Sequence, residues 1–318
     1  PAEEGGATCV PPAAEAGASP CTAPLKPGDD RLCEYPLNGR TRKFYVYAPP
    51  SFDPCKPASL IVDNHGLSES TEVHIGRASF SATRPKGYGS GWRRAVQGDN
   101  AIVVTPQGIN NAWNQQTDVP FLNDVANKVE KMANIDPERV YVTGISMGGM
   151  MTFATACADA KRWRGMSSIA TLSTACPSLA RPIPLISFHA ETDTLTSYPN
   201  DRKGTEAVAK LNHCKRGPTP LASFGGPNSS PLPFCFANPP KDGSPDATEP
   251  NAIPMAACPT TAKESTCIQW DECDEGVKVV FCTVSAASQY LGGHLLYTND
   301  TGLNVAVMSW DFLKQFQK

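Results

Sequence analysis

Short apolar runs rich in β-branched residues recur along the chain and alternate with segments of helical periodicity. Runs such as SLIVDN at 59–64 and AIVVT at 101–105 lack the polar alternation of half-exposed strands, which is typical of strands buried on both faces. The expected strands cover 42–47, 59–64, 101–105, 139–144, 184–189 and 277–284. Helices are expected over 121–135, 147–158, 204–211 and 305–316. This alternation predicts an α/β fold in which a mostly parallel sheet carries helices on both faces.

Twelve cysteines are scattered over the 318 residues without the spacing of a metal site. An even, high number predicts disulfides, which persist in oxidising compartments. We therefore expect a secreted or periplasmic protein whose signal peptide has been removed, with no bound metal. The formal net charge is −3 and no long charged run occurs, which argues against partners such as nucleic acids or anionic membranes. No stretch of about 18 apolar residues is present, so no transmembrane helix is expected.

Two segments interrupt the regular pattern. Residues 1–35 are rich in Ala, Gly, Pro and Glu and carry three cysteines, so we expect a surface segment tethered by disulfides ahead of one domain over 36–318. Residues 214–273 are dense in Pro, Gly, Asn and Ser and hold five cysteines. We expect a disulfide-bonded insertion there, before the last strand. It is either a lid or wall of a binding site or a surface loop without function. We expect the chain to act as a monomer.

The sequence GISMGG at 144–149 lies between an expected strand and an expected helix. In that setting G-x-S-x-G forms a sharp turn that raises the serine oxygen above the edge of the sheet. Glycine fits at 144 and 148 because such a turn packs its backbone too tightly for side chains. Ser146 is therefore the predicted nucleophile.

A serine hydroxyl needs a base and an orienting acid, which follow the nucleophile in chain order in folds of this kind. Glu191 and Asp193 come directly after one expected strand, and His294 follows the last expected strand within a Gly-Gly-His sequence. His294 is the candidate base, and spacing favours Asp193 over Glu191 only slightly. His213 also lies beyond the acid, but its place at a helix end suggests a capping or surface role.

Negative charge that develops on a substrate oxygen needs two backbone N–H groups aimed at it. Met147, directly after the nucleophile, should supply one, and Leu67 in the turn after the strand 59–64 should supply the other. His65 in that turn is expected to be structural. Ser68 and Trp113 are candidate substrate contacts, although a buried core tryptophan is the alternative for Trp113.

The sequence IDPERVYVTGISMGGM at 135–150 resembles the signature of the polyhydroxybutyrate depolymerase and feruloyl esterase-like family of secreted α/β-hydrolases. Further matches are HG at 65–66, PQG at 106–108, WN at 113–114, DVPFL at 118–122, HAETD at 189–193 and GH at 293–294. The resemblance implies an α/β-hydrolase fold. It also favours Asp193 as the acid and adds Tyr198 as a candidate substrate contact.

The chain departs from the pattern of that family around the expected substrate pocket. After His294 it has Leu-Leu-Tyr where the family usually has Trp-Pro-Gly, and Ala190 and Ser197 replace a usual Gly and Pro. These departures leave the three reacting residues intact. The resemblance therefore implies the reaction but does not fix the substrate.

Together these features predict a secreted serine hydrolase that cleaves carboxylic esters through an acyl-enzyme and needs no cofactor. The expected substrate is polymeric, a polyester such as polyhydroxybutyrate. The alternative is a feruloyl or acetyl esterase that acts on plant polysaccharide. Two rival hypotheses are a serine peptidase and an inactive fold kept as a binding module. An intact set of Ser, Asp and His argues against the inactive fold, because the three act as a unit.

Overall fold

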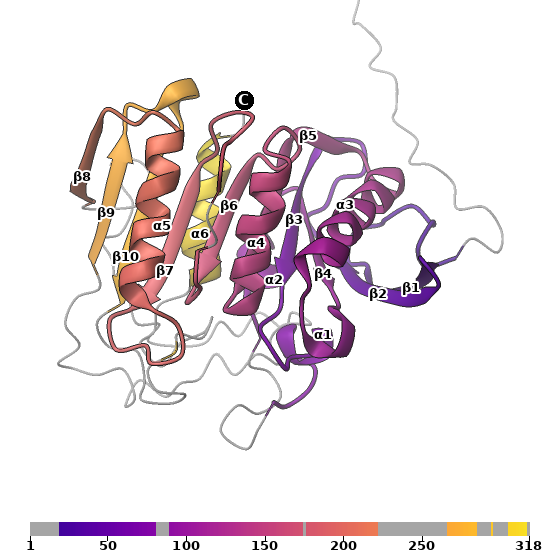
Figure 1. The fold of residues 1–318 in the computed structure, drawn as a ribbon. Helices are drawn as coiled ribbons and strands as arrows, with labels where there is room; N and C mark the ends of the chain where they lie inside the picture. Colours follow the sequence, from indigo (N-terminus) through magenta and orange to yellow (C-terminus); the bar gives the residue numbers. More distant parts are fainter. Residues whose placement is uncertain are drawn as a thin grey trace, which may run out of the picture.

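The computed structural model describes residues 19–80, 89–173, 176–221, 266–284, 294 and 305–316. Within this part the strands form one ten-stranded sheet (Figure 1). The strands are β1 (Asp30–Leu37), β2 (Arg40–Tyr47), β3 (Ala58–Asn64), β4 (Ala101–Pro106), β5 (Ile135–Ile145), β6 (Gly165–Ile169), β7 (Leu185–Ala190), β8 (Arg216–Leu221), β9 (Thr266–Asp271) and β10 (Val279–Val284). The α-helices are α1 (Thr71–His74), α2 (Trp92–Ala95), α3 (Gln115–Met132), α4 (Met147–Ala158), α5 (Tyr198–Leu211) and α6 (Val305–Leu313).

The strand order is β1-β2-β4-β3-β5-β6-β7-β10-β9-β8. The six strands from β4 to β10 in this order run parallel, and two antiparallel strands flank them on each side. Every residue of β3, β4, β6 and β7 is buried. For β3, β4 and β7 the lack of polar alternation in the sequence predicts this burial. Because the central strands are parallel, their carboxyl ends, and the loops that follow them, meet at one edge of the sheet.

Helices cover both faces of the sheet, as predicted. Helices α3, α4 and α5 lie on one face and α2 and α6 on the other (Figure 1). The first layer contributes side chains such as Phe121 and Phe153 to one buried cluster. The second contributes Trp92 and Trp310 to a separate cluster. The sheet between these two cores is a rigid frame for the loops at its edge.

The N-terminal part is more regular than its composition predicts. Strand β1 begins at Asp30, so the boundary expected after residue 35 falls inside a strand paired with β2. A disulfide joins Cys21 to Cys33, and the N–H of Leu25 donates to the carbonyl of Met132 at 2.8 Å. The disulfide and the strand pairing thus fix a segment whose sequence has no apolar periodicity. Residues 1–18 lie outside the described part.

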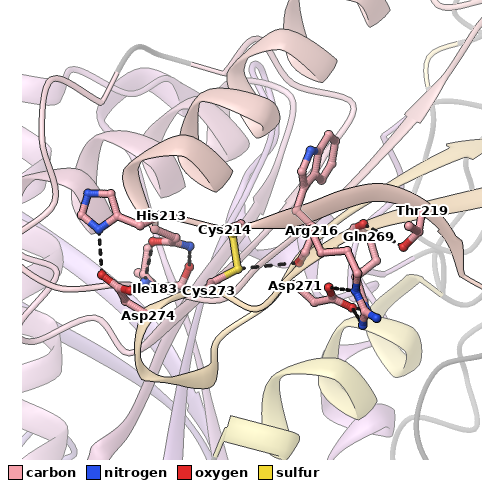
Figure 2. The surroundings of a disulfide bond; sticks show 11 residues. Ile183, His213, Cys214, Arg216, Thr219, Gln269, Asp271, Cys273 and Asp274 are labelled. Atoms are coloured by element: carbon pink, nitrogen blue, oxygen red, sulfur yellow. Dashed lines mark hydrogen bonds and ion pairs between the residues drawn. A yellow bond between two sulfur atoms is a disulfide. The ribbon is translucent and has the colours of Figure 1, made fainter.

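The insertion expected over 214–273 begins and ends on the sheet. A disulfide joins Cys214 to Cys273, and the two ends form the antiparallel strands β8 and β9. The guanidinium of Arg216 contacts both carboxylate oxygens of Asp271 at 2.5 Å, as Figure 2 shows beside the disulfide. Residues 222–265, which make up most of the expected insertion, lie outside the described residues, and so does the choice between a lid or wall and a surface loop without function.

Disulfides are frequent in the described part. Besides the two already named, Cys157 is bonded to Cys176 and Cys267 to Cys282, and Cys55 is disulfide-bonded as well. None of the described cysteines is free. This agrees with the oxidising environment predicted from the sequence. Among the described helices, none combines the length and the apolar character needed to cross a membrane.

Candidate active site

Ser146 lies in a strained turn between β5 and α4. Its φ of 53° and ψ of −119° are rarely adopted by a residue with a side chain. Its N–H donates to the carbonyl of Ile169 at 2.8 Å, and its own carbonyl accepts from the N–H of Met150 at 3.1 Å. The side chain is partly exposed although the strand before it is buried. The turn thus presents the hydroxyl at the carboxyl edge of the sheet, as the motif predicts.

Two glycines allow this turn to pack against its neighbours. A Cβ on Gly144 would lie 2.4 Å from the carbonyl oxygen of Gly148. A Cβ on Gly148 would lie 2.2 Å from the carbonyl oxygen of Asn64 and 2.4 Å from that of His65. These distances are too short for a side chain, so only glycine lets the start of α4 contact the loop after β3. The two backbone segments expected to bind a substrate oxygen are therefore in direct contact.

The loop after β3 carries Leu67, whose side chain is 56% exposed. Within the described part of the chain, neither the N–H of Leu67 nor that of Met147 has a hydrogen-bond partner. Met147 is the first residue of α4, where an N–H has no partner within the helix. The start of a helix also favours negative charge. The absence of a partner for either N–H among the described residues is what an oxyanion site at these two groups requires.

A tryptophan and a neutral histidine hold this loop from one side. The indole N–H of Trp113 donates to the carbonyl of His65 at 2.8 Å, and the two rings lie 4.6 Å apart. His65 Nε2 accepts from the N–H of Gly108 at 2.9 Å, while Nδ1 contacts the carbonyl of Gly66 at 2.7 Å. Burial lowers the pKa of His65 to about 4. The ring is therefore neutral and structural, as the sequence predicts.

A buried ionic network holds the same loop from the other side. The N–H of Gly66 donates to Glu69 Oε2 at 2.8 Å, and His74 Nδ1 lies 2.9 Å from the same oxygen. His74 Nε2 lies 3.1 Å from Asp63 Oδ1. Burial alone would lower the pKa of His74, but the charges of Asp63 and Glu69 and their hydrogen bonds raise it to about 9. A histidine cation between two carboxylates thus fixes the position of Gly66.

Asp193 and His294 are 101 residues apart in the chain and in contact in the structure. His294 Nδ1 lies 2.7 Å from Asp193 Oδ2, and both side chains are buried. Asp193 Oδ1 accepts from the N–H groups of Leu195 and Thr196 at 2.8 and 2.9 Å. Burial alone would raise the pKa of Asp193, but hydrogen bonds from His189 and His294 hold it well below its usual range. A carboxylate only accepts, so Nδ1 carries the hydrogen and leaves Nε2 as the proton acceptor.

Two threonine hydroxyls connect the loop of Asp193 with the turn of Ser146. Thr196 Oγ1 donates to Asp193 Oδ2 at 2.7 Å and lies 3.1 Å from the carbonyl oxygen of Ala170. Thr171 Oγ1 donates to the carbonyl of Ser146 at 2.8 Å. The loops after β5, β6 and β7 are therefore held in register with one another. Strands β5 and β7 are separated only by β6, which places their ends roughly 10 Å apart at the usual strand spacing.

The remaining predicted residues have distinct surroundings. Trp113 is buried, yet it lines a cavity of about 540 Å³ beside the β1–β2 turn. Ser68 is exposed, and its N–H donates to the carbonyl of Asn111 at 2.8 Å. Tyr198 packs its ring on Phe281, and its hydroxyl lies 2.8 Å from that of a threonine on β10. Among the described residues no cluster of His, Cys, Asp and Glu has the arrangement of a metal site.

Sequence reasoning did not foresee two buried groups of this site. One is the Asp63, Glu69 and His74 network, and the other is His189, which contacts Asp193 from behind. Their only sequence signal is a charged or titratable residue within an apolar strand, such as Asp63 in SLIVDN.

Relatives of known class resemble this chain over most of its length. "Putative esterase NocK" of Nocardia uniformis subsp. tsuyamanensis is 26% identical over 300 residues, covering 88% of this chain and 81% of the relative. Feruloyl esterase B of Piromyces equi is 26% identical over 304 residues, which is 86% of this chain but only 45% of that protein. No protein-family model matches the chain. These relatives are esterases, which confirms the predicted class of enzyme, a carboxylic ester hydrolase.

A solved structure, that of an acetyl xylan esterase from Aspergillus awamori, is also similar. The two chains align with a TM-score of 0.51 and 14% identity, covering 80% of this chain and 92% of the other. At that identity the comparison concerns the fold alone. It confirms the predicted α/β-hydrolase fold.

Proposed function

We propose that this protein is a secreted serine esterase in which Ser146, His294 and Asp193 form the catalytic triad. The contact between His294 Nδ1 and Asp193 Oδ2 at 2.7 Å is the observation that carries the proposal. It joins a base and an acid from distant parts of the chain, at the sheet edge where the strained turn presents Ser146. The insertion and the N-terminal segment are additions to a single catalytic domain. The protein acts as a monomer.

The mechanism follows from the arrangement of these groups. Ser146 Oγ attacks the ester carbonyl carbon while His294 Nε2 accepts its proton, and Asp193 stabilises the imidazolium that forms. The tetrahedral oxyanion accepts hydrogen bonds from the N–H groups of Leu67 and Met147. His294 then protonates the departing alcohol. Water, deprotonated by the same base, attacks the acyl-enzyme and releases the carboxylic acid.

For the substrate, a feruloyl ester on plant polysaccharide is better supported than polyhydroxybutyrate. The support comes from a relative named as a feruloyl esterase that aligns with 86% of this chain. The polyester prediction rested on the family resemblance alone. Acetyl esters remain the second candidate within this class, because a relative named as a bifunctional acetylxylan esterase/xylanase, from Neocallimastix patriciarum, is 26% identical to this chain over 165 residues.

The test is a panel of substrates given to the wild type and to Ser146→Ala. The panel contains a short-chain nitrophenyl ester, a feruloyl ester, acetylated xylan, a polyhydroxybutyrate film and a peptide. We expect the wild type to hydrolyse the feruloyl ester most efficiently, and Ser146→Ala to lose a thousandfold or more in kcat. A folded wild type that is no faster than Ser146→Ala on every ester would refute the proposal. A preference for the film would restore the polyester reading.

A further inference from the structure

A second histidine lies behind Asp193 and has no role in the mechanism above. His189 is on β7, and its side chain is fully buried. Its Nε2 lies 3.3 Å from Asp193 Oδ2, the same oxygen that His294 contacts. Its Nδ1 lies 2.8 Å from Asp201 Oδ2 on α5. The ring of His189 therefore bridges two carboxylates, one of which belongs to the proposed triad.

The surroundings of His189 favour a positive charge on its ring. The groups of opposite charge that face it are Asp193, from the loop after β7, and Asp201, from α5. The other neighbours are neutral: the carbonyl of Thr196 at 3.3 Å and the edge of Tyr198, whose ring centre is 5.9 Å away. Burial alone would lower the pKa of His189, but hydrogen bonds to the two carboxylates raise it to about 9. Burial also raises the pKa of Asp201 above its usual value, and the two carboxylates together favour the imidazolium form of His189.

Asp201, the second carboxylate that His189 contacts, is itself fixed by hydrogen bonds. Asp201 is buried at the start of α5, and Ser187 on β7 donates to its Oδ2 at 3.0 Å. Ser168 on β6 donates to Ser187 at 2.9 Å. The pair of His189 and Asp201 is thus fixed by two strands and a helix, and its position relative to Asp193 cannot change without a shift in the core.

We propose that His189, held by Asp201, is a positioning residue that fixes the Asp193 carboxylate and limits the basicity of His294. The inference rests on the proposed function, because it takes His294 as the base. Because His189 contacts the same Asp193 oxygen as His294, its positive charge offsets part of the negative charge there, and the carboxylate stabilises the protonated form of His294 less. A less basic His294 is neutral, and so able to accept the proton of Ser146, over a wider range of pH.

The alternative is that His189 and Asp201 form a buried ion pair that serves only stability. The two readings differ in what happens when one charge is removed. Removal of His189 alone leaves two buried carboxylates and no cation, which favours the protonated form of His294. Removal of both charges leaves the local net charge as it was. A role in stability alone lowers the melting temperature in both variants but does not move the titration of His294.

The experiment compares wild type, His189→Gln, the double variant His189→Gln/Asp201→Asn and the control His213→Gln. His213 is an exposed histidine that also pairs with an aspartate, Asp274, at 2.7 Å. Two readouts are taken: the acid limb of the pH profile of kcat/KM, and the titration of the His294 ring by NMR, assigned with His294→Gln. We expect both midpoints to rise by roughly one pH unit in His189→Gln. They should rise by less than half as much in the double variant and not at all in the control.

Unchanged midpoints in a folded His189→Gln would overturn the proposal while leaving the esterase function intact. If the wild type hydrolyses no ester, the proposed function fails, and the NMR titration still tests the effect of His189 on His294. If His189→Gln does not fold, nitrogen-15 spectra of the wild-type histidines decide, assigned with the double variant. A His189 ring with both nitrogens protonated at neutral pH supports the proposal, and a neutral ring refutes it.

Discussion

The hydroxyl of Thr171 donates a hydrogen bond to the carbonyl of Ser146 at 2.8 Å, from a position just after β6. This bond holds the backbone of the proposed nucleophile in a conformation that is costly without support, by about 1–3 kcal/mol for such a residue. Thr171 follows Ala170, whose own φ is +47° and whose carbonyl is bound by Thr196. The strained turn at Ser146 is therefore held by its neighbours in the sheet as well as by its own sequence.

Thr171→Val removes this hydroxyl and keeps the shape of the side chain. We expect kcat to fall roughly fivefold with KM nearly unchanged, because a lost hydrogen bond of this kind is worth about 1 kcal/mol. Thr171→Ser keeps the hydroxyl and is the matched control. Equal kcat values for the two variants would contradict the role assigned to the bond.

Gly148→Ala should destabilise the protein although alanine is the better helix former. The added Cβ would lie 2.2 Å from the carbonyl oxygen of Asn64, so the start of α4 must move away from the loop that carries Leu67. We expect a lower melting temperature and at least a hundredfold loss of kcat, the effect of removing one oxyanion donor. Gly98→Ala is the control, since nothing lies within 4 Å of its Cβ. If Gly148→Ala behaves like this control, the close approach is not needed for activity.

Glu69→Gln tests the ionic network behind the loop after β3. One oxygen of Glu69 accepts from Gly66 and also contacts His74. Glutamine keeps one acceptor oxygen but removes the negative charge that pairs with the His74 cation. We expect kcat to fall at least tenfold through displacement of the Leu67 N–H, and unfolding to become easier by about 1–3 kcal/mol. Glu130→Gln is the control, because its pair with Arg162 lies at the surface and is worth little. Activity retained by Glu69→Gln would show that Gly66 needs no such support.

Stability should fall as the pH rises from about 6.5 to about 9. The pKa values of His74 and His189 are both raised to about 9 in the folded protein. Between the unfolded and folded pKa values the native state binds more protons than the unfolded state, so the stabilisation is complete below about 6.5 and is lost as the pH rises through 9. Each histidine should contribute on the order of 1–3 kcal/mol to the change. Urea denaturation across this range measures it, and a flat or rising curve contradicts the two buried cations.

The Cys214–Cys273 disulfide should stabilise the fold more than Cys267–Cys282 does. The sequence separations are 59 and 15 residues, and the entropy of the unfolded chain is reduced more by closing the longer loop. Serine replacement of both cysteines should therefore cost about 1 kcal/mol more for the first pair than for the second. Denaturant titrations of the two double variants give the comparison. An equal or smaller loss for the first pair would mean that loop closure does not dominate.

The central strands were predictable because burial on both faces leaves a continuous apolar run. The runs at 59–64 and 101–105 match β3 and β4 within a residue. Strand β6 was not predicted, since its sequence GMSSI has only one β-branched residue and is buried between β5 and β7. Helix α5 begins at Tyr198 rather than at 204, because Pro199 lies in the first turn, where proline is tolerated.

Within the candidate site, short-range sequence patterns predicted Ser146 as the nucleophile, and chain order predicted His294 as the base. The choice of Asp193 needed the family resemblance, because Glu191 has the same relation to the strand. The partners behind these residues could not be predicted. His189 contacts Asp201 only because a helix returns across the face of β7, and no local pattern encodes that return.

Leu221, the last residue of β8, is paired with Cys267 of β9 across the sheet. The chain between these two residues therefore starts and ends at the same place on the sheet. A longer loop costs little extra entropy to close, so a change in the length of this stretch need not move its two ends. Strands β5 and β7, which precede Ser146 and Asp193, lie elsewhere in the sheet, so a binding module could be grafted between the two ends without moving those strands.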